Sequence, residues 1–160
     1  MDATTMPLTN SLLSNLQNDF PQFTFKEDSK FLWSAHHQTI SIDRNVEHCN
    51  EFTLHELSHA LLGHQGYLSD IDLIKLERDA WEYAGNHLAP QYGYSIDEDI
   101  VQDNLDTYRD WLHARSQCPD CNAVGLQTKS RHYRCLSCGH TWRVNDAKLC
   151  ALRRYSLNTK

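Results

Sequence analysis

No stretch of this sequence approaches the roughly 20 consecutive apolar residues that a membrane-spanning helix needs. The first ten residues contain no basic group and no apolar core, which disfavours a secretory signal. Internal repeats and low-complexity segments are also missing. We therefore expect no membrane partner and a cytoplasmic location. The apolar content of 40% and the charged content of 22% are those of an ordinary folded chain.

Basic residues are scarce in the first part of the chain. Residues 1–114 contain 6 Lys and Arg against 19 Asp and Glu, whereas residues 115–160 contain 9 against 2. The aliphatic residues become rare at the same point, where the sequence reads "SQCPDC". A chain of 160 residues suffices for one main domain and a small appendage. We therefore predict an acidic main domain over residues 1–115 and a basic module over residues 116–160.

The apolar pattern of the main domain predicts both helices and strands. Four segments have helical periodicity or capping signals: "LTNSLLSNLQNDF", "EFTLHELSHALLGHQG", "SDIDLIKLERDAWEYAGNHLAP" and "SIDEDIVQDNLDTYRDWLHAR". Ser69 and Ser95 are the expected caps of the last two, and Pro90 is expected to end the third. The short stretches "QFTFK", "KFLWSA" and "QTISID" predict a small antiparallel meander. A brief final helix is expected in "AKLCALRRY".

The second helical segment carries polar side chains where apolar ones would pack better. Its His55, Glu56 and His59 form the pattern HExxH. Residues four apart share one helix face, so the two imidazoles can bind one ion. Burying each of these polar side chains without a partner would cost about 1–3 kcal/mol, and a metal ion bound by them relieves that cost. The pattern therefore predicts a zinc site, with Glu56 as the general base of a hydrolase.

A catalytic zinc normally has three protein ligands, and the residues alone leave the third one open. His64 lies five residues after His59, which is about 140° around a helix, so a capping or packing role is favoured for it. The acids of the next helix, Glu77, Asp79 and Glu82, are the remaining candidates. Tyr67, Tyr92, Tyr94 and His87 are candidates for stabilising an oxyanion.

The segments "FTLHELSHALLGH" and "ERDAWEYAGNHLAP" together resemble the ImmA/IrrE metallopeptidases. The resemblance implies that Glu77 is the third zinc ligand, and Asp79 is the reserve. It also implies an endopeptidase whose substrate is an intracellular protein, such as a DNA-binding transcriptional repressor. Tyr83 and the run "NHLAP" depart from the family pattern, which puts the substrate groove in doubt. The expected fold is α+β, with a small antiparallel sheet packed on a zincin-like helical bundle.

Four of the six cysteines form two CxxC pairs: Cys118, Cys121, Cys135 and Cys138. Two such knuckles can close a tetrahedral site of four thiolates, so the basic module is predicted to be a zinc ribbon. We therefore expect two zinc ions per chain, one catalytic and one structural. Cys49 and Cys150 are expected only to pack.

The ribbon also combines cations with aromatic residues: Lys129, Arg131, Tyr133, Arg134, Trp142 and Arg143. This composition would suit contact with nucleic acid. The alternative is that the module is basic for solubility or to dock on the acidic body, and has zinc because its own core is small.

The leading hypothesis is a zinc endopeptidase of ImmA/IrrE type. One alternative is a SprT-like protease acting on DNA-associated proteins, whose third ligand would be His87 or His113. The other alternative is a non-enzymatic adaptor, whose ribbon binds nucleic acid or protein and whose HExxH zinc is structural.

Overall fold

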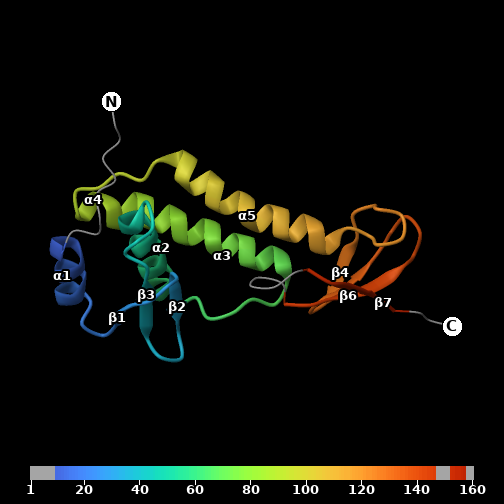
Figure 1. Ribbon diagram of the computed structural model, residues 1–160, viewed down its shortest axis with the longest axis horizontal. Coiled ribbons are helices and arrows are strands. Elements are labelled where there is room, and N and C mark those ends of the chain that lie inside the picture. The colour runs from blue at the N-terminus through green and yellow to red at the C-terminus, as the bar shows by residue number, and fades with distance from the viewer. Residues whose placement is uncertain (1–9, 147–151, 158–160) are drawn as a thin grey trace. The chain divides into compact units, whose positions relative to one another are not determined.

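The computed structural model describes residues 10–146 and 152–157, and the fold is α+β (Figure 1). Contacts divide the chain into two compact units, Met1–Gln65 with Leu76–Val101, and Gly66–Lys75 with Gln102–Lys160. The boundary predicted after residue 115 therefore falls inside the second unit. No helix within the described residues is both long enough and apolar enough to cross a membrane.

The elements follow the chain in the order helix, three strands, helices, and four strands. The helices are α1 (Asn10–Asp19), α2 (Cys49–Leu61), α3 (Asp70–Tyr83), the π-helix η1 (Ala84–Leu88), α4 (Ala89–Gln91) and α5 (Glu98–Ser116). The strands are β1 (Thr24–Glu27), β2 (Leu32–Ser34), β3 (Thr39–Ile42), β4 (Leu126–Lys129), β5 (His132–Arg134), β6 (Thr141–Val144) and β7 (Arg154–Ser156).

The sheet of the first unit is mixed, with β3 in the centre between β1 and β2. The predicted antiparallel pairing is correct for β2 and β3, but the meander is wrong for β1, which pairs with β3 in parallel. Alternation shows that a segment is a strand but not which neighbour it pairs with. Because β3 is buried while β1 and β2 are largely exposed, it takes the central position.

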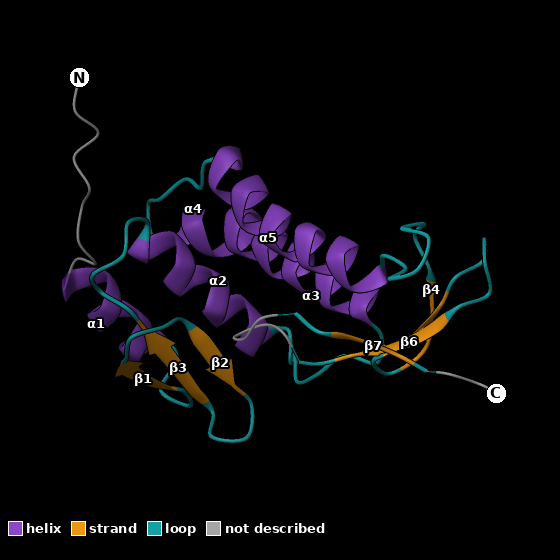
Figure 2. Ribbon diagram, turned by 45° about the vertical axis from the view of Figure 1, so that its right-hand side comes forward, coloured by secondary structure: helices purple, strands orange, loops and turns teal. Residues whose placement is uncertain are grey.

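Helix α2 packs across β2 and β3 (Figure 2). Its contacts with the sheet and with α1 form the core of the first unit, which contains Leu16, Ile40, Ile42, Leu54 and Leu57. Each of these side chains is at most 1% exposed. This burial fixes the helix that carries HExxH.

The predicted cap of α3 is present, because the Ser69 N–H and hydroxyl both donate to the Asp72 carboxylate. The helical path continues from α3 through η1 into α4 and ends at Gln91, one residue after the predicted stop at Pro90. A π-helical turn widens the helix just before Pro90, where its ring would meet a carbonyl of a regular α-helix. Helix α5 is capped by Asp97 instead of Ser95, with the Asp99 N–H donating to the Asp97 carboxylate.

The second unit contains a four-stranded antiparallel sheet of order β4, β5, β6, β7. Residues 147–151 of the expected final helix lie outside the described residues, and Arg154–Ser156 forms β7 instead. Edge pairing with β6 thus determines the structure of Arg154–Ser156, which the local sequence pattern did not reveal. Cys49 is buried as expected, and Cys150 lies outside the described residues.

Candidate metal centres

Helix α2 presents two imidazoles on its buried face. His55 and His59 are 2% and 8% exposed, and their Nε2 atoms lie 3.2 Å apart. One helical turn separates the two residues, so this approach follows from the backbone itself.

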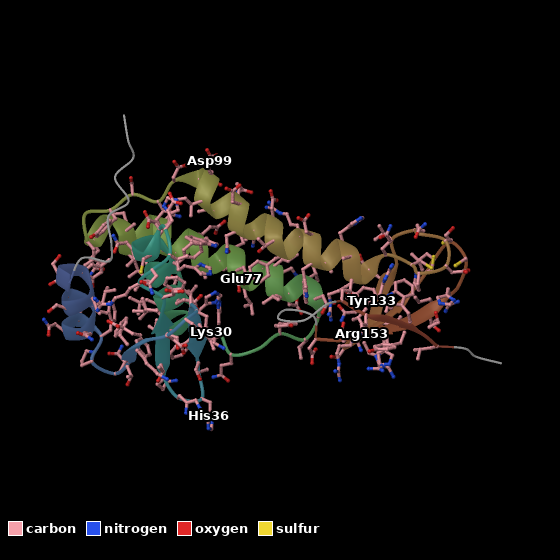
Figure 3. The ribbon with its side chains drawn as sticks, in the orientation of Figure 1. Lys30, His36, Glu77, Asp99, Tyr133 and Arg153 are labelled. Carbon is pink, nitrogen blue, oxygen red and sulfur yellow. The ribbon has the colours of Figure 1, made fainter. Side chains whose placement is uncertain are left out.

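The third group of this centre is Glu77 of α3, which Figure 3 labels. Its Oε2 lies 2.9 Å from His55 Nε2 and 3.5 Å from His59 Nε2, and the residue is only 5% exposed. The side chain of Asp79, the reserve ligand, is 46% exposed and pairs with Arg78 at 3.0 Å. Of the two acids, Glu77 is therefore the one that meets the histidines.

The spacing of the three atoms fits a metal ion. Ligand atoms around a tetrahedral zinc, with bonds of about 2.0–2.1 Å, lie about 3.3–3.4 Å apart. The distances between the three groups, 2.9, 3.2 and 3.5 Å, bracket that value. Burial by itself raises the pKa of Glu77, but hydrogen bonds from His55 and His59 hold that pKa well below its ordinary value. A charged carboxylate and two imidazoles could therefore bind a cation here.

The ring of His55 is held in place by stacking. Trp81 of α3 lies parallel to it, with the ring centroids 4.2 Å apart and the planes inclined by 24°. The Nδ1 atom of His55 is buried and has no hydrogen-bond partner among the described residues. Packing against Trp81 therefore orients this imidazole in place of the usual hydrogen bond to its second nitrogen.

His64 turns back toward His59 because α2 ends in a Schellman motif. Gly63 adopts φ 69°, its N–H donates to the Ala60 carbonyl, and the His64 N–H donates to the His59 carbonyl. The Nδ1 atoms of His64 and His59 then lie 2.8 Å apart. The helical projection that pointed His64 away from the site was wrong, because the helix has already ended at this residue.

Glu56 is held by the edge strand β2. The backbone N–H of Trp33 donates to Glu56 Oε2 at 2.8 Å, and the Trp33 indole donates to the His64 carbonyl at 2.8 Å. The same tryptophan thus fixes both the carboxylate that follows His55 and the loop that carries His64.

The second candidate centre contains the four ribbon cysteines. Cys118 and Cys138 have their Sγ atoms 3.7 Å apart, and those of Cys121 and Cys135 are 3.5 Å apart. A tetrahedral zinc with bonds of about 2.3 Å would hold its sulfurs about 3.8 Å apart. The two observed Sγ–Sγ distances are close to this value, and all four Sγ atoms lie in one group. The four cysteines could therefore bind a metal ion.

The two knuckles have the backbone that such a site needs. Asn122 and Gly139, which follow the two CxxC pairs, both have positive φ, at 63° and 76°. Their N–H groups donate to the carbonyls of Cys118 and Cys135. The Cys138 N–H lowers the pKa of Cys135 to about 7, which favours the thiolate form.

Three contributors to the first centre were not predicted from the sequence: Trp33, His64 as a partner of His59, and Trp81. Gly63 at the end of the helix was the one local signal for His64, because glycine after a helix indicates a chain reversal. Trp33 and Trp81 reach the site only through sheet and helix packing. The oxyanion candidate Tyr92 donates its hydroxyl to Asp19 at 2.6 Å.

The other histidines proposed for the metal do not join it in the described structure. His87 packs against Tyr83 with the ring centroids 4.8 Å apart. Neither His87 nor His113 belongs to a group of metal-binding side chains among residues 10–146 and 152–157. Comparison of the chain with protein-family models, with curated proteins and with solved structures finds no match.

Proposed function

We propose that this chain is a zinc-dependent endopeptidase of ImmA/IrrE type, with a zincin-like catalytic unit and a zinc ribbon, acting on a cytoplasmic protein such as a transcriptional repressor. The observation that carries the proposal is the convergence of His55 Nε2, His59 Nε2 and Glu77 Oε2 in a buried position. A zinc ion held there supplies the Lewis acidity that polarises a peptide carbonyl and lets water attack it near neutral pH.

Glu56 is the proposed general base of the reaction. It accepts a proton from the attacking water and donates it to the departing amine. Its hydrogen bond from the Trp33 N–H fixes the orientation of the carboxylate. Glu56 is not one of the three converging groups, so it is free to exchange a proton.

The edge strand β2 supports a peptide as the substrate. β2 pairs with β3 on one side, and the Trp33 N–H points to the other side, toward Glu56. An extended peptide can add to such an edge through backbone hydrogen bonds. The edge would then present the peptide beside the general base.

Glu56→Gln tests the activity. Zinc-loaded wild type and Glu56→Gln are added to native extract, and mass spectrometry compares the new peptide termini. We expect cleavage products from wild type and a loss of at least about 100-fold in their rate of formation with Glu56→Gln, whose zinc content stays unchanged. Equal products from both proteins would contradict the proposal.

The ligand assignment is tested by a matched pair of acids on α3. Glu77→Gln should lose zinc from the centre, whereas Asp79→Asn, which changes a half-exposed carboxylate two residues away, should keep it. Retention of zinc in Glu77→Gln together with its loss in His87→Ala would favour the SprT-like alternative. Full cellular function of Glu56→Gln would favour the adaptor.

A further inference from the structure

The register of the ribbon sheet sorts its side chains onto two faces. Side chains alternate along each strand, so Tyr133 and Trp142, which are paired across β5 and β6, share one face. Both are buried and their rings stack 5.6 Å apart. The opposite face, termed the outer face, carries Lys129, His132, Arg134, Arg143 and Tyr155.

Packing fills the inner face. The Trp142 indole donates to the Arg115 carbonyl, and the Tyr133 hydroxyl donates to Asp70 at the first turn of α3. The side chains of Lys129, Arg134 and Tyr155 remain exposed on the outer face. This face is therefore the side of the sheet on which a partner could lie.

The outer face is cationic. The four strands contain no Asp or Glu, and the cross-strand register places Lys129 beside His132, His132 beside Arg143, and Arg143 beside Tyr155. Neighbouring strands are about 4.8 Å apart, so these residues form a continuous row across the sheet. The positive row is complementary to a chain of phosphates.

One aromatic ring lies within this row. The Arg143 guanidinium lies 4.7 Å from the centroid of the Tyr155 ring, and Tyr155 is 39% exposed. A planar cation on an exposed ring forms a surface on which a nucleic-acid base can stack. An acidic protein would match the charge of the face but would make no use of this stacked pair.

We propose that the outer face of the ribbon sheet binds single-stranded nucleic acid without sequence preference. Lys129, Arg134 and Arg143 contact phosphates, and Tyr155 stacks on a base. A broad sheet face does not enter the major groove of a duplex, which accommodates a helix or a two-stranded ribbon. Unpaired bases can stack on the partly exposed pair that Arg143 and Tyr155 form. This binding does not depend on the peptidase activity proposed above.

Fluorescence anisotropy of the full-length zinc-loaded protein tests the proposal. The probes are fluorescein-labelled single-stranded DNA and RNA of mixed sequence, about 20 nucleotides long, and the corresponding duplex DNA. We expect single strands of both kinds to bind more tightly than the duplex. Tyr155→Leu should weaken binding of single strands roughly tenfold, because stacking on the ring is lost. Arg143→Gln should lower the slope of log affinity against log salt by about 0.7.

Arg109→Gln is the matched control, because it removes one exposed cation of α5, outside the sheet. It should leave the affinity close to that of wild type, and zinc content with circular dichroism establishes that each variant is folded. Absence of binding at about 50 mM salt would overturn the proposal. Equal losses of affinity in Arg109→Gln and Arg143→Gln would also overturn it, and so would an unchanged affinity in Tyr155→Leu. If polyglutamate competes as well as single-stranded nucleic acid, the partner is an acidic protein and the proposal is likewise overturned.

Discussion

His64 illustrates how one side chain outside the three converging groups can govern their geometry. The Nδ1 atoms of His59 and His64 lie 2.8 Å apart, and a metal bound at His59 Nε2 would leave the hydrogen on its Nδ1, which would then donate to His64. Such a hydrogen bond fixes the tautomer and the ring orientation of a ligand histidine. The Trp33 indole in turn holds the backbone of His64 through its carbonyl.

His64→Ala is therefore expected to weaken zinc binding at the first centre by roughly 10–100-fold. His64→Asn should restore most of the affinity, because its amide oxygen can accept the same hydrogen bond. Competition with a chromophoric chelator measures both values. If His64→Ala and His64→Asn bind zinc equally well, His64 is only a packing residue.

At the scale of elements, the C-terminus of α2 depends on one glycine. Gly63 has φ 69°, a conformation that costs an L residue roughly 1–2 kcal/mol. A Cβ at this position would meet no atom within 4 Å, so the cost of a substitution comes from the backbone alone.

Gly63→Ala should consequently lower the free energy of unfolding by about 1 kcal/mol and weaken the contact between His64 and His59. Gly66→Ala is the control, because Gly66 has no positive φ and equal space around it. Urea denaturation measures the two stabilities. Equal values for the two variants would show that the reversal at Gly63 is not strained.

A buried ionic network joins three elements of the second unit. Arg115 at the end of α5 donates through Nε to Asp70 at 2.8 Å, and Tyr133 of β5 donates to the same carboxylate. Arg115 also donates to the Asn145 carbonyl. Asp70 is 3% exposed and Arg115 is 2% exposed, so neither charge has water as an alternative partner.

Asp70→Ala is expected to destabilise the second unit by about 3–5 kcal/mol, because Arg115 would remain buried and uncompensated. The double variant Asp70→Ala with Arg115→Met should lose less than the sum of the single changes, since no unpaired charge remains. Chemical denaturation followed by tryptophan fluorescence gives the comparison. Strict additivity of the two changes would mean that the pair is not coupled.

At the scale of the whole molecule, the two candidate centres have different ligands and belong to different compact units. The first offers two imidazoles and a carboxylate, and the second offers four thiols. Reagents that react with thiols should therefore release metal from the ribbon only.

We expect metal analysis to find two zinc ions per chain, one for each group of converging side chains. His59→Ala should leave one ion, which a mercurial reagent releases, and Cys138→Ser should leave one that resists it. A wild-type value of one zinc, unchanged in His59→Ala, would remove the first centre.

The compact units also differ from the predicted segments of the chain. Residues 66–75 and 102–115 pack with the ribbon, although their sequence is acidic and helical like that of the main domain. Composition marks where the character of a chain changes. It does not show that Arg115 and Tyr133 both donate hydrogen bonds to the buried carboxylate of Asp70.

The sequence by itself determined the local features. The HExxH spacing brought two imidazoles to one helix face, and the CxxC pairs with Asn122 and Gly139 specified two knuckles that bring four thiols together. These depend on the geometry of a few consecutive residues.

Only the tertiary structure decided which distant groups meet. The approach of Glu77 to both histidines, the parallel pairing of β1, the stacking of Trp81 on His55 and the row of side chains on the outer face all follow from how helices and strands pack. Such pairings join residues far apart in the chain, and no local pattern specifies which partners bury the most surface together.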